Sequence, residues 1–213
     1  MTGAEMVVKT LEKNGVKVVF GYPGAANCPI IDKLSFSSIK HILTRNEQGA
    51  AHMASGYARV TKQAGVCTAT SGPGATNLIT GIATAYMDSI PMVALTGQVA
   101  TKLIGKDAFQ EVDITGATLP FTKHSYLIKD GLDIPRVVNE AFHIANTGRP
   151  GPVLIDFPMD LLKKEFDYPD EDEDVNIRGY KLMGKANESQ VKKVAEAIKG
   201  AKKPVILAGG GVV

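Results

Sequence analysis

The chain has 213 residues and a mass of 22.6 kDa, with 44% hydrophobic and 22% charged residues. These values exclude a wholly disordered chain, a collagen-like repeat and a mini-protein that depends on disulfides. The formal net charge is +2, and residues 1–166 are nearly neutral, with 16 basic and 14 acidic side chains. That balance argues against nucleic acid as the main partner.

Helices and strands are predicted in alternation along the chain. The first helix begins at Thr2, which has capping-box spacing to Glu5, and ends near Gly15. Apolar runs and helical periods then predict, in order, strand 16–20, helix 30–34, strand 39–43, helix 46–62, strand 65–70, helix 75–87, strands 91–96 and 121–128, helix 134–146 and strand 152–157.

The predicted strands are nearly continuous apolar runs, which is typical of a parallel sheet covered by helices on both faces. The fold class is therefore α/β, a three-layer α/β/α domain with a parallel sheet. Ligands of such sheets bind at the carboxyl ends of the strands. The glycine-rich segments at 21–24, 71–74 and 97 all follow predicted strands, so the sequence predicts a ligand site at this edge.

The domain organisation is predicted from a shift in composition. Residues 1–166 form one complete domain, and residues 167–186 form an acidic linker that begins with six acids and no base over 167–177. Residues 187–213 are interpreted as the truncated start of a Rossmann-like central domain, with helix 189–199 and strand 204–208. The basic residues of 178–213 either form the solvated face of a helix or contact an anion.

The cysteines and the hydropathy pattern indicate the cellular compartment of the protein. Cys28 and Cys67 have no zinc-site spacing, and two cysteines make no disulfide framework. The first 17 residues are amphipathic and charged, unlike a signal peptide, and no apolar stretch approaches about 18 residues. We expect a cytoplasmic protein that makes no membrane contact.

Two motifs admit more than one interpretation. The segment 72–77 follows a strand and opens a helix, but Asn77 stands where the dinucleotide fingerprint has its third glycine. It is either a tight turn or a ligand loop. Glu47 follows a strand among small neighbours. It is either a buried acid that shares a proton with a ligand nitrogen or a first-turn acid favoured by the helix dipole. The four histidines show no metal-ligand spacing.

Seven segments in family order resemble the N-terminal, pyrimidine-binding domain of thiamine-diphosphate-dependent enzymes. Within that family they are most similar to catalytic subunits of the acetolactate synthase (acetohydroxyacid synthase) type. The segments are FGYPG at 20–24, RNEQGA at 45–50, TSGPGATN at 70–77, TGQV at 96–99, DAFQE at 107–111, TKH at 122–124 and GRPGPV at 148–153.

The resemblance implies a role for Glu47 as the catalytic acid that hydrogen-bonds N1′ of the cofactor's aminopyrimidine ring. A carboxylate suits this role because the proton must pass back and forth. The implied reaction decarboxylates pyruvate and joins it to a second 2-keto acid, giving 2-acetolactate or 2-aceto-2-hydroxybutyrate for branched-chain amino acids (valine, leucine, isoleucine). Such an enzyme is a transferase.

The resemblance also implies further site residues. Cofactor-binding positions would be Tyr22, Pro23, Gly24, Glu47, Pro73, Asn77, Gln110 and Arg149. Phe109 and Gln110 would lie near the substrate, and Arg149 would reach FAD, as suits a planar, permanently charged donor. Four positions depart from the usual family pattern, namely Ala25, Asn46, Ala100 and Met159, and the last two bear on substrate preference.

The implied cofactors are thiamine diphosphate, FAD and Mg²⁺. In the family that the chain resembles, a Gly-Asp-Gly motif of a C-terminal domain holds Mg²⁺, and no Gly-Asp-Gly occurs in this chain. The implied partners are a second copy, which forms the active site at a dimer interface, and a small regulatory subunit. The chain would then be inactive alone. The alternatives are another thiamine-diphosphate-dependent decarboxylase or carboligase, a non-catalytic association module, and a dinucleotide-binding domain.

Overall fold

A computed structural model describes residues 1–168, 175–182 and 184–212. The chain divides into two compact units, Met1–Ile177 and Arg178–Val213. None of the helices within the described ranges is long and apolar enough to cross a membrane.

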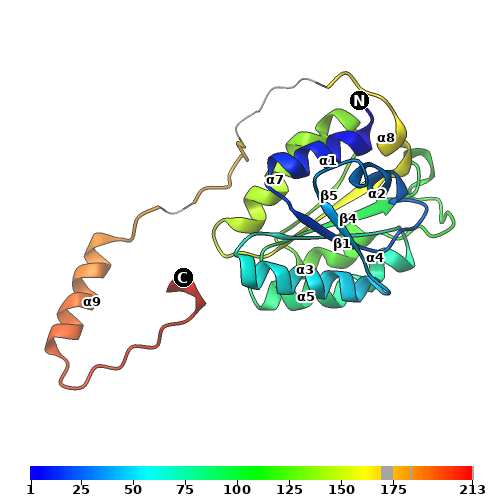
Figure 1. The fold of residues 1–213 in the computed structure, drawn as a ribbon. Coiled ribbons are helices and arrows are strands. Elements are labelled where there is room, and N and C mark those ends of the chain that lie inside the picture. Colours follow the sequence, from blue (N-terminus) through cyan, green and yellow to red (C-terminus); the bar gives the residue numbers. More distant parts are fainter. Residues whose placement is uncertain (169–174, 183, 213) are drawn as a thin grey trace. The chain divides into compact units, whose positions relative to one another are not determined.

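The first unit is built on a six-stranded sheet in which every neighbouring pair is parallel (Figure 1). The strand order is β2-β1-β3-β4-β6-β5. Strands β3, β4 and β6 are buried along their whole length, which confirms the predicted parallel sheet with both faces covered. The strands are β1 (Val18–Gly21), β2 (Lys40–Leu43), β3 (Gly65–Ala69), β4 (Met92–Gln98), β5 (His124–Leu127) and β6 (Pro152–Pro158).

Helices cover the two faces of the sheet in the expected three layers. In Figure 1, α1 and α7 lie over one face and α3 and α5 over the other. Two separate clusters of buried apolar residues fill the two interfaces. The helices of this unit are α1 (Gly3–Lys13), α2 (Cys28–Leu34), α3 (Glu47–Thr61), α4 (Pro73–Asn77), α5 (Ile79–Met87), α6 (Ile114–Thr118), α7 (Ile134–Asn146) and α8 (Met159–Lys163), with short 3₁₀ turns at Thr101–Leu103, Leu119–Phe121 and Gly131–Asp133.

The first helix begins as the sequence predicts. The Thr2 hydroxyl accepts a hydrogen bond from the Glu5 amide at 3.2 Å, and the Glu5 carboxylate accepts one from the Thr2 amide at 2.8 Å. This reciprocal capping box satisfies two amide groups that the helix leaves unpaired. The predicted start of α1 is therefore confirmed.

The predicted helix 75–87 is wrong in its bounds, because the structure has two helices there, α4 and α5. The amide of Leu78 bonds back three residues to the carbonyl of Ala75 at 3.1 Å, which tightens the chain between the two helices. The helix also starts two residues earlier, at Pro73, where proline suits a first helical position.

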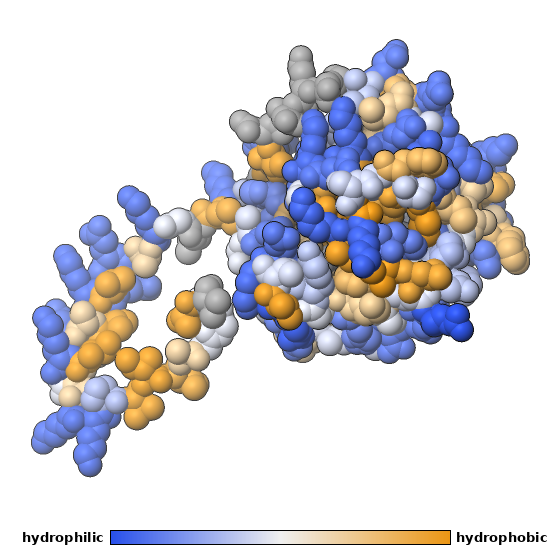
Figure 2. All heavy atoms as spheres, in the orientation of Figure 1, coloured by the Kyte–Doolittle hydropathy of each residue, from blue (hydrophilic) through white to orange (hydrophobic). Residues whose placement is uncertain are grey.

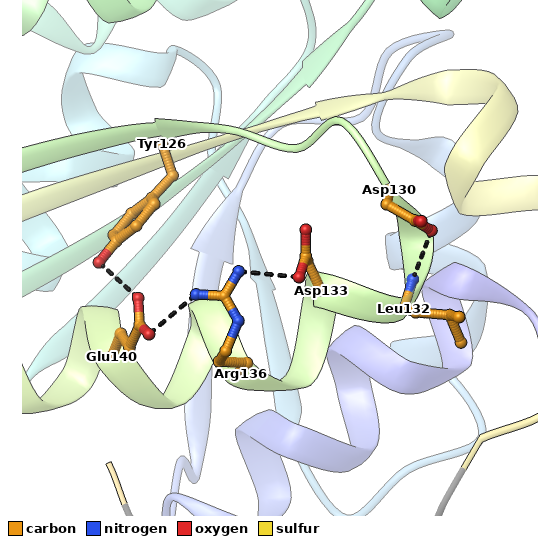
Figure 3. Close-up of polar contacts among 6 residues, drawn as sticks. All are labelled: Tyr126, Asp130, Leu132, Asp133, Arg136 and Glu140. Atoms are coloured by element: carbon orange, nitrogen blue, oxygen red, sulfur yellow. Dashed lines mark hydrogen bonds and ion pairs between the residues drawn. The ribbon is translucent and has the colours of Figure 1, made fainter. Parts of the chain in front are cut away.

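A polar network joins the edge strand β5 to α7 (Figure 3). The Tyr126 hydroxyl donates to Glu140 Oε2 at 2.9 Å, and Arg136 Nη1 donates to Glu140 Oε1 at 2.9 Å. Arg136 Nη2 reaches Asp133 Oδ1 at 2.8 Å. Glu140 is nearly buried, so these bonds compensate a carboxylate that has lost most of its water.

The sheet topology marks a particular point on its carboxyl edge. From β1 the chain moves outward to β2, then returns to β3 on the other side of β1 and continues to β4. The connections therefore leave β1 and β3 in opposite directions. In open parallel sheets, such a switch point opens a crevice where ligands bind.

The second unit contains one helix, α9 (Glu188–Gly200), and a 3₁₀ turn at Gly210–Val212 in its described residues. The predicted helix 189–199 is confirmed, whereas the predicted strand 204–208 is wrong. Val205, Ile206 and Leu207 are almost fully exposed, and no described segment pairs with them. An apolar run becomes a strand only when a neighbour supplies its hydrogen bonds.

Apolar side chains of this second unit face solvent along α9 and the residues that follow it, where Figure 2 shows orange atoms. The predicted boundaries at 166 and 187 stay predictions. Residues 169–174 of the predicted acidic linker and Met183 lie outside the described residues.

Candidate active site

The loop after β1 is fastened by a buried asparagine. Asn27 Nδ2 donates to the Tyr22 carbonyl at 3.1 Å and to Thr68 Oγ1 at 3.3 Å, while its Oδ1 accepts from the Gly24 amide at 2.8 Å. The side chain is fully buried. The loop that carries Tyr22, Pro23 and Gly24 is therefore held before any ligand arrives, with Tyr22 and Pro23 exposed.

The turn after β3 lies against this loop. Thr70 Oγ1 accepts from the Ala26 amide at 3.1 Å. A Cβ atom at Gly24 would lie 2.5 Å from the Cβ of Thr70, and one at Gly74 would lie 2.7 Å from its Cγ2. The two loops meet around Thr70 because glycine allows the backbone to approach this closely. They are the loops at the topological switch point.

Glu47 occupies the first turn of α3, where Asn46 caps the helix by accepting from the amides of Gln48 at 2.7 Å and Gly49 at 3.3 Å. Asparagine is a strong N-cap residue, so the departure at Asn46 has a structural role. Asn77 Nδ2 donates to Glu47 Oε2 at 3.0 Å. Glu47 is partly exposed, not buried as one interpretation required, and it has the first-turn position that the other required.

The other carboxylate oxygen of Glu47 points at the glycine turn. A Cβ at Gly74 would lie 3.4 Å from Glu47 Oε1. The structure thus joins three segments that are distant in sequence, namely the β1 loop, the start of α3 and the short helix α4. Pro73 and Asn77 belong to the last of these, so six of the expected cofactor-binding residues lie together.

Gln110 joins the same group through its backbone. It has a positive φ of 58°, and a Cβ at Gly72 would lie 2.6 Å from the Gln110 carbonyl oxygen. Gly72 itself has φ of 59°, a conformation that favours glycine. Phe109, the neighbouring residue, is 88% exposed. The structure places both residues at the tip of the segment between β4 and α6, and this tip lies against the turn that follows β3.

A buried carboxyl group supports the base of that segment. Asp156, on β6, accepts from Thr96 Oγ1 at 2.7 Å and from Gln98 Nε2 at 2.8 Å. Gln98 Nε2 also donates to the Val112 carbonyl at 2.8 Å. Burial raises the pKa of Asp156 to about 7, and the Asp113 carboxylate adds to the rise, while the two hydrogen bonds oppose it.

Arg149 is the one expected site residue that the structure does not bring to this group. It precedes β6, so it lies at the amino edge of the parallel sheet. Its Nε donates to Ser89 Oγ at 2.7 Å and its Nη2 to the Met87 carbonyl at 3.3 Å, just after α5. Its guanidinium also faces the ring of Tyr86 at 5.9 Å.

The arrangement suits a flat heterocycle with a nitrogen that bonds to a carboxylate. Glycine at 24 and 74 lets both loops pack against Thr70, and glycine at 72 lets the Gln110 backbone approach, so that the partly exposed Glu47 carboxylate lies beside closely packed backbone. The residues present therefore fit the pyrimidine half of thiamine diphosphate. Within the described residues, no group of three or more His, Cys, Asp and Glu could hold a metal ion.

Sequence reasoning assigned no role to several residues that hold the site together. Asn27, Thr70 and Asp156 fasten its loops and strands. An asparagine after a glycine turn is a signal for local hydrogen bonding and could have pointed to Asn27. Thr70 and Asp156 act across the sheet, and the sequence carries no comparable signal for such contacts.

Residues 1–117 match the family model described as "Thiamine pyrophosphate enzyme, N-terminal TPP binding domain". The chain belongs to this family. The matched range holds every expected site residue except Arg149. The match covers more than half of the chain and includes strands β1 to β4 and the loops around Glu47.

Three curated relatives match this chain over its whole length. It is 56% identical to the "Probable acetolactate synthase large subunit" of Methanocaldococcus jannaschii and 55% identical to an "Acetolactate synthase" of Mycobacterium bovis. It is 52% identical to the "Acetolactate synthase large subunit" of Buchnera aphidicola subsp. Schizaphis graminum. The chain spans 36%, 34% and 38% of the lengths of these relatives.

Proposed function

We propose that this chain is the part of an acetolactate synthase that activates thiamine diphosphate. The reaction would decarboxylate pyruvate and join the remaining two carbons to a second pyruvate or to 2-ketobutyrate. The observation that carries the proposal is the Glu47 carboxylate, partly exposed and hydrogen-bonded to Asn77 beside a glycine turn at the sheet's switch point. Identities of 52–56% to acetolactate synthases support the choice of reaction.

The residues of the chain would divide the work as follows. Tyr22, Pro23, Gly24 and Pro73 would line the ring, and the accessible oxygen of Glu47 would hold or accept a proton at the ring nitrogen. Asn77 would keep the other Glu47 oxygen in place through its 3.0 Å hydrogen bond. Gln110 and Phe109 would face the substrate from the tip of their segment. When bound, thiamine diphosphate supplies the electron sink for decarboxylation.

Other requirements would be met outside the Glu47 site. Mg²⁺ with the diphosphate would bind to a part of the enzyme that this chain lacks, and FAD would be a further cofactor. Arg149 would contact FAD from the amino edge of the sheet. The domain limits are proposed as 1–166 for the pyrimidine-binding domain, 167–186 for the linker and 187–213 for the start of a central domain.

The proposed partners follow from the same function. Several relatives are named large subunits, and we extend that naming to a small regulatory subunit for this protein. A second copy would complete the active site at a dimer interface, in the cytoplasm. Because the chain spans about a third of its relatives, we expect it to be inactive alone, and acetolactate formation by the 213-residue chain would contradict this.

The test of Glu47 uses a full-length enzyme that contains this chain. Glu47→Gln keeps the size and one acceptor but cannot exchange a proton. We expect hydrogen exchange at C2 of bound thiamine diphosphate, followed by NMR, to slow by about 100-fold or more. Glu12→Gln is the matched control, because Glu12 is an exposed acid on α1, away from the site. Its carboxylate accepts hydrogen bonds from Ser38.

The outcomes separate the proposed function from its rivals. An unchanged exchange rate in Glu47→Gln, with cofactor bound, would remove Glu47 from its role. Cofactor activation with products other than acetolactate would favour another decarboxylase or carboligase. Failure of the full-length enzyme to bind thiamine diphosphate would favour an association module.

A further inference from the structure

The segment that carries Phe109 and Gln110 has an unusual backbone. Within seven residues, Gly105, Asp107 and Gln110 have positive φ values of 77°, 51° and 58°. Residues other than glycine seldom adopt this conformation, because it brings the Cβ atom close to the backbone. Two such residues so close together require a compensating interaction within the segment.

Glu111 supplies that interaction. Its Oε2 accepts from the Ala108 amide at 2.9 Å, and its Oε1 accepts from the Gly105 amide in a very short bond. These backbone amides hold the pKa of Glu111 below its usual value. An ionised carboxylate makes stronger hydrogen bonds to amides than a neutral acceptor does. One side chain thus closes residues 105–111 into a loop.

The position of the 105–111 loop is coupled to the Glu47 site through backbone contacts. The backbone of Gln110 lies so close to Gly72 that a Cβ there would be 2.6 Å from the Gln110 oxygen. Gly72 starts the turn into α4, whose Asn77 is bonded to Glu47. A shift of the 105–111 loop would therefore move Gln110 relative to Glu47.

We propose that Glu111 is the positioning residue of this site, and that its carboxylate holds Gln110 and Phe109 in their working place before any ligand binds. The inference rests on the proposed function for the roles of Gln110 and Phe109. Glu111 itself contacts backbone amides of its own loop and needs no contact with substrate.

The first test follows the loop directly in the 213-residue chain. Glu111→Gln replaces one accepting oxygen with a donor, so we expect the amides of Gly105 and Ala108 to exchange with solvent about tenfold faster or more. Asp113→Asn is the matched control, since Asp113 is an acid two residues after Glu111 that accepts instead from Thr115 and Gly116. It should leave the Gly105 and Ala108 amides unchanged. Equal exchange in wild type and Glu111→Gln would overturn the proposal.

The second test measures catalysis in a full-length enzyme that contains this chain. Glu111→Gln should lower kcat for acetolactate formation by about tenfold, with the affinity for thiamine diphosphate unchanged, whereas a general loss of folding would weaken both. Glu111→Asp, which keeps the charge, should recover part of the rate. Faster amide exchange with an unaltered kcat would contradict the positioning role. If the wild-type enzyme forms no acetolactate, the proposed function fails, and the amide exchange still decides what Glu111 does to the loop.

Discussion

Asp156 is a carboxyl group that the sheet has removed from water. It is 1% exposed on β6, and it accepts hydrogen bonds from two neutral side chains of the neighbouring strand β4. Burial and the neighbouring Asp113 favour its protonated form. The protonation of Asp156, and with it the charge beneath the segment that carries Gln110, therefore depends on pH.

The stability of the first unit should depend on pH through this group. Burial raises the pKa of Asp156 to about 7, whereas an unfolded aspartate has a pKa of about 3.9. Below about pH 4 both states are protonated, and between about 4 and 7 only the folded state keeps the proton. The contribution of Asp156 to the free energy of unfolding therefore falls as the pH rises through this window, by up to about 1.4 kcal/mol per pH unit.

Asp156→Asn checks this expectation because it removes the titration and keeps an acceptor for Thr96 or Gln98. Urea unfolding at several pH values between 4 and 8 should show the variant gaining stability relative to wild type up to about pH 7, and no further change above it. A difference that does not vary with pH would show that Asp156 stays charged in the folded protein.

At the scale of single elements, the sequence was most informative about the sheet and α1. Continuous apolar runs and a capping box predicted them, since both signals are local. It failed at 204–208, where a similar apolar run has no partner strand among the described residues, and at Leu78, where one amide bonds back three residues. Pairing and helix breaks of this kind depend on contacts that no local pattern encodes.

The candidate site shows the same division. Glycine turns placed Gly24 and Gly74 at the carboxyl edge, and the family resemblance supplied Glu47 and Asn77. The hydrogen bond between Glu47 and Asn77 and the contact of the Gln110 backbone with Gly72 join residues distant in sequence, so they become visible only in the folded structure. Positive φ at Gln110 could not be predicted, because glutamine is not a residue that favours it.

The network between β5 and α7 should stabilise that edge of the sheet. Tyr126→Phe removes the hydroxyl that donates to Glu140 (Figure 3), and we expect a loss of about 1 kcal/mol in the free energy of unfolding. Burial and the Glu140 carboxylate also raise the pKa of Tyr126, so the hydroxyl stays a donor at neutral pH. A double-mutant cycle with Glu140→Leu, which removes the acceptor, measures the coupling, and purely additive effects would rule out the interaction.

At the scale of the whole molecule, the first unit contains all of the buried apolar core found in the described residues, and its last segment returns to its first. The Phe166 amide donates to the Met1 carbonyl at 2.9 Å, and the Gly3 amide donates to the Lys164 carbonyl at 3.1 Å. Leu162 is fully buried. The residues just before the acidic segment thus belong to the fold of this unit.

A chain ending at Ile177 should therefore fold alone and melt within about 2 °C of the full chain, because no buried apolar residue is lost. A chain ending at Asp160 is the matched control, and it should melt at a clearly lower temperature since it lacks Leu162 and Phe166. Calorimetry on both chains distinguishes these outcomes. A large drop for the chain ending at Ile177 would show that residues 178–213 stabilise the first unit.

The sheet ends on both sides in a strand of only four residues, β2 and β5. Short edge strands, and charged side chains such as Lys40 on β2, discourage another chain from adding a strand. Continuing the sheet across an interface is thus disfavoured, which protects the unit against aggregation through its edges. A second copy, or any other protein partner, would meet this unit through its helices and loops, the surfaces that also carry the Glu47 site.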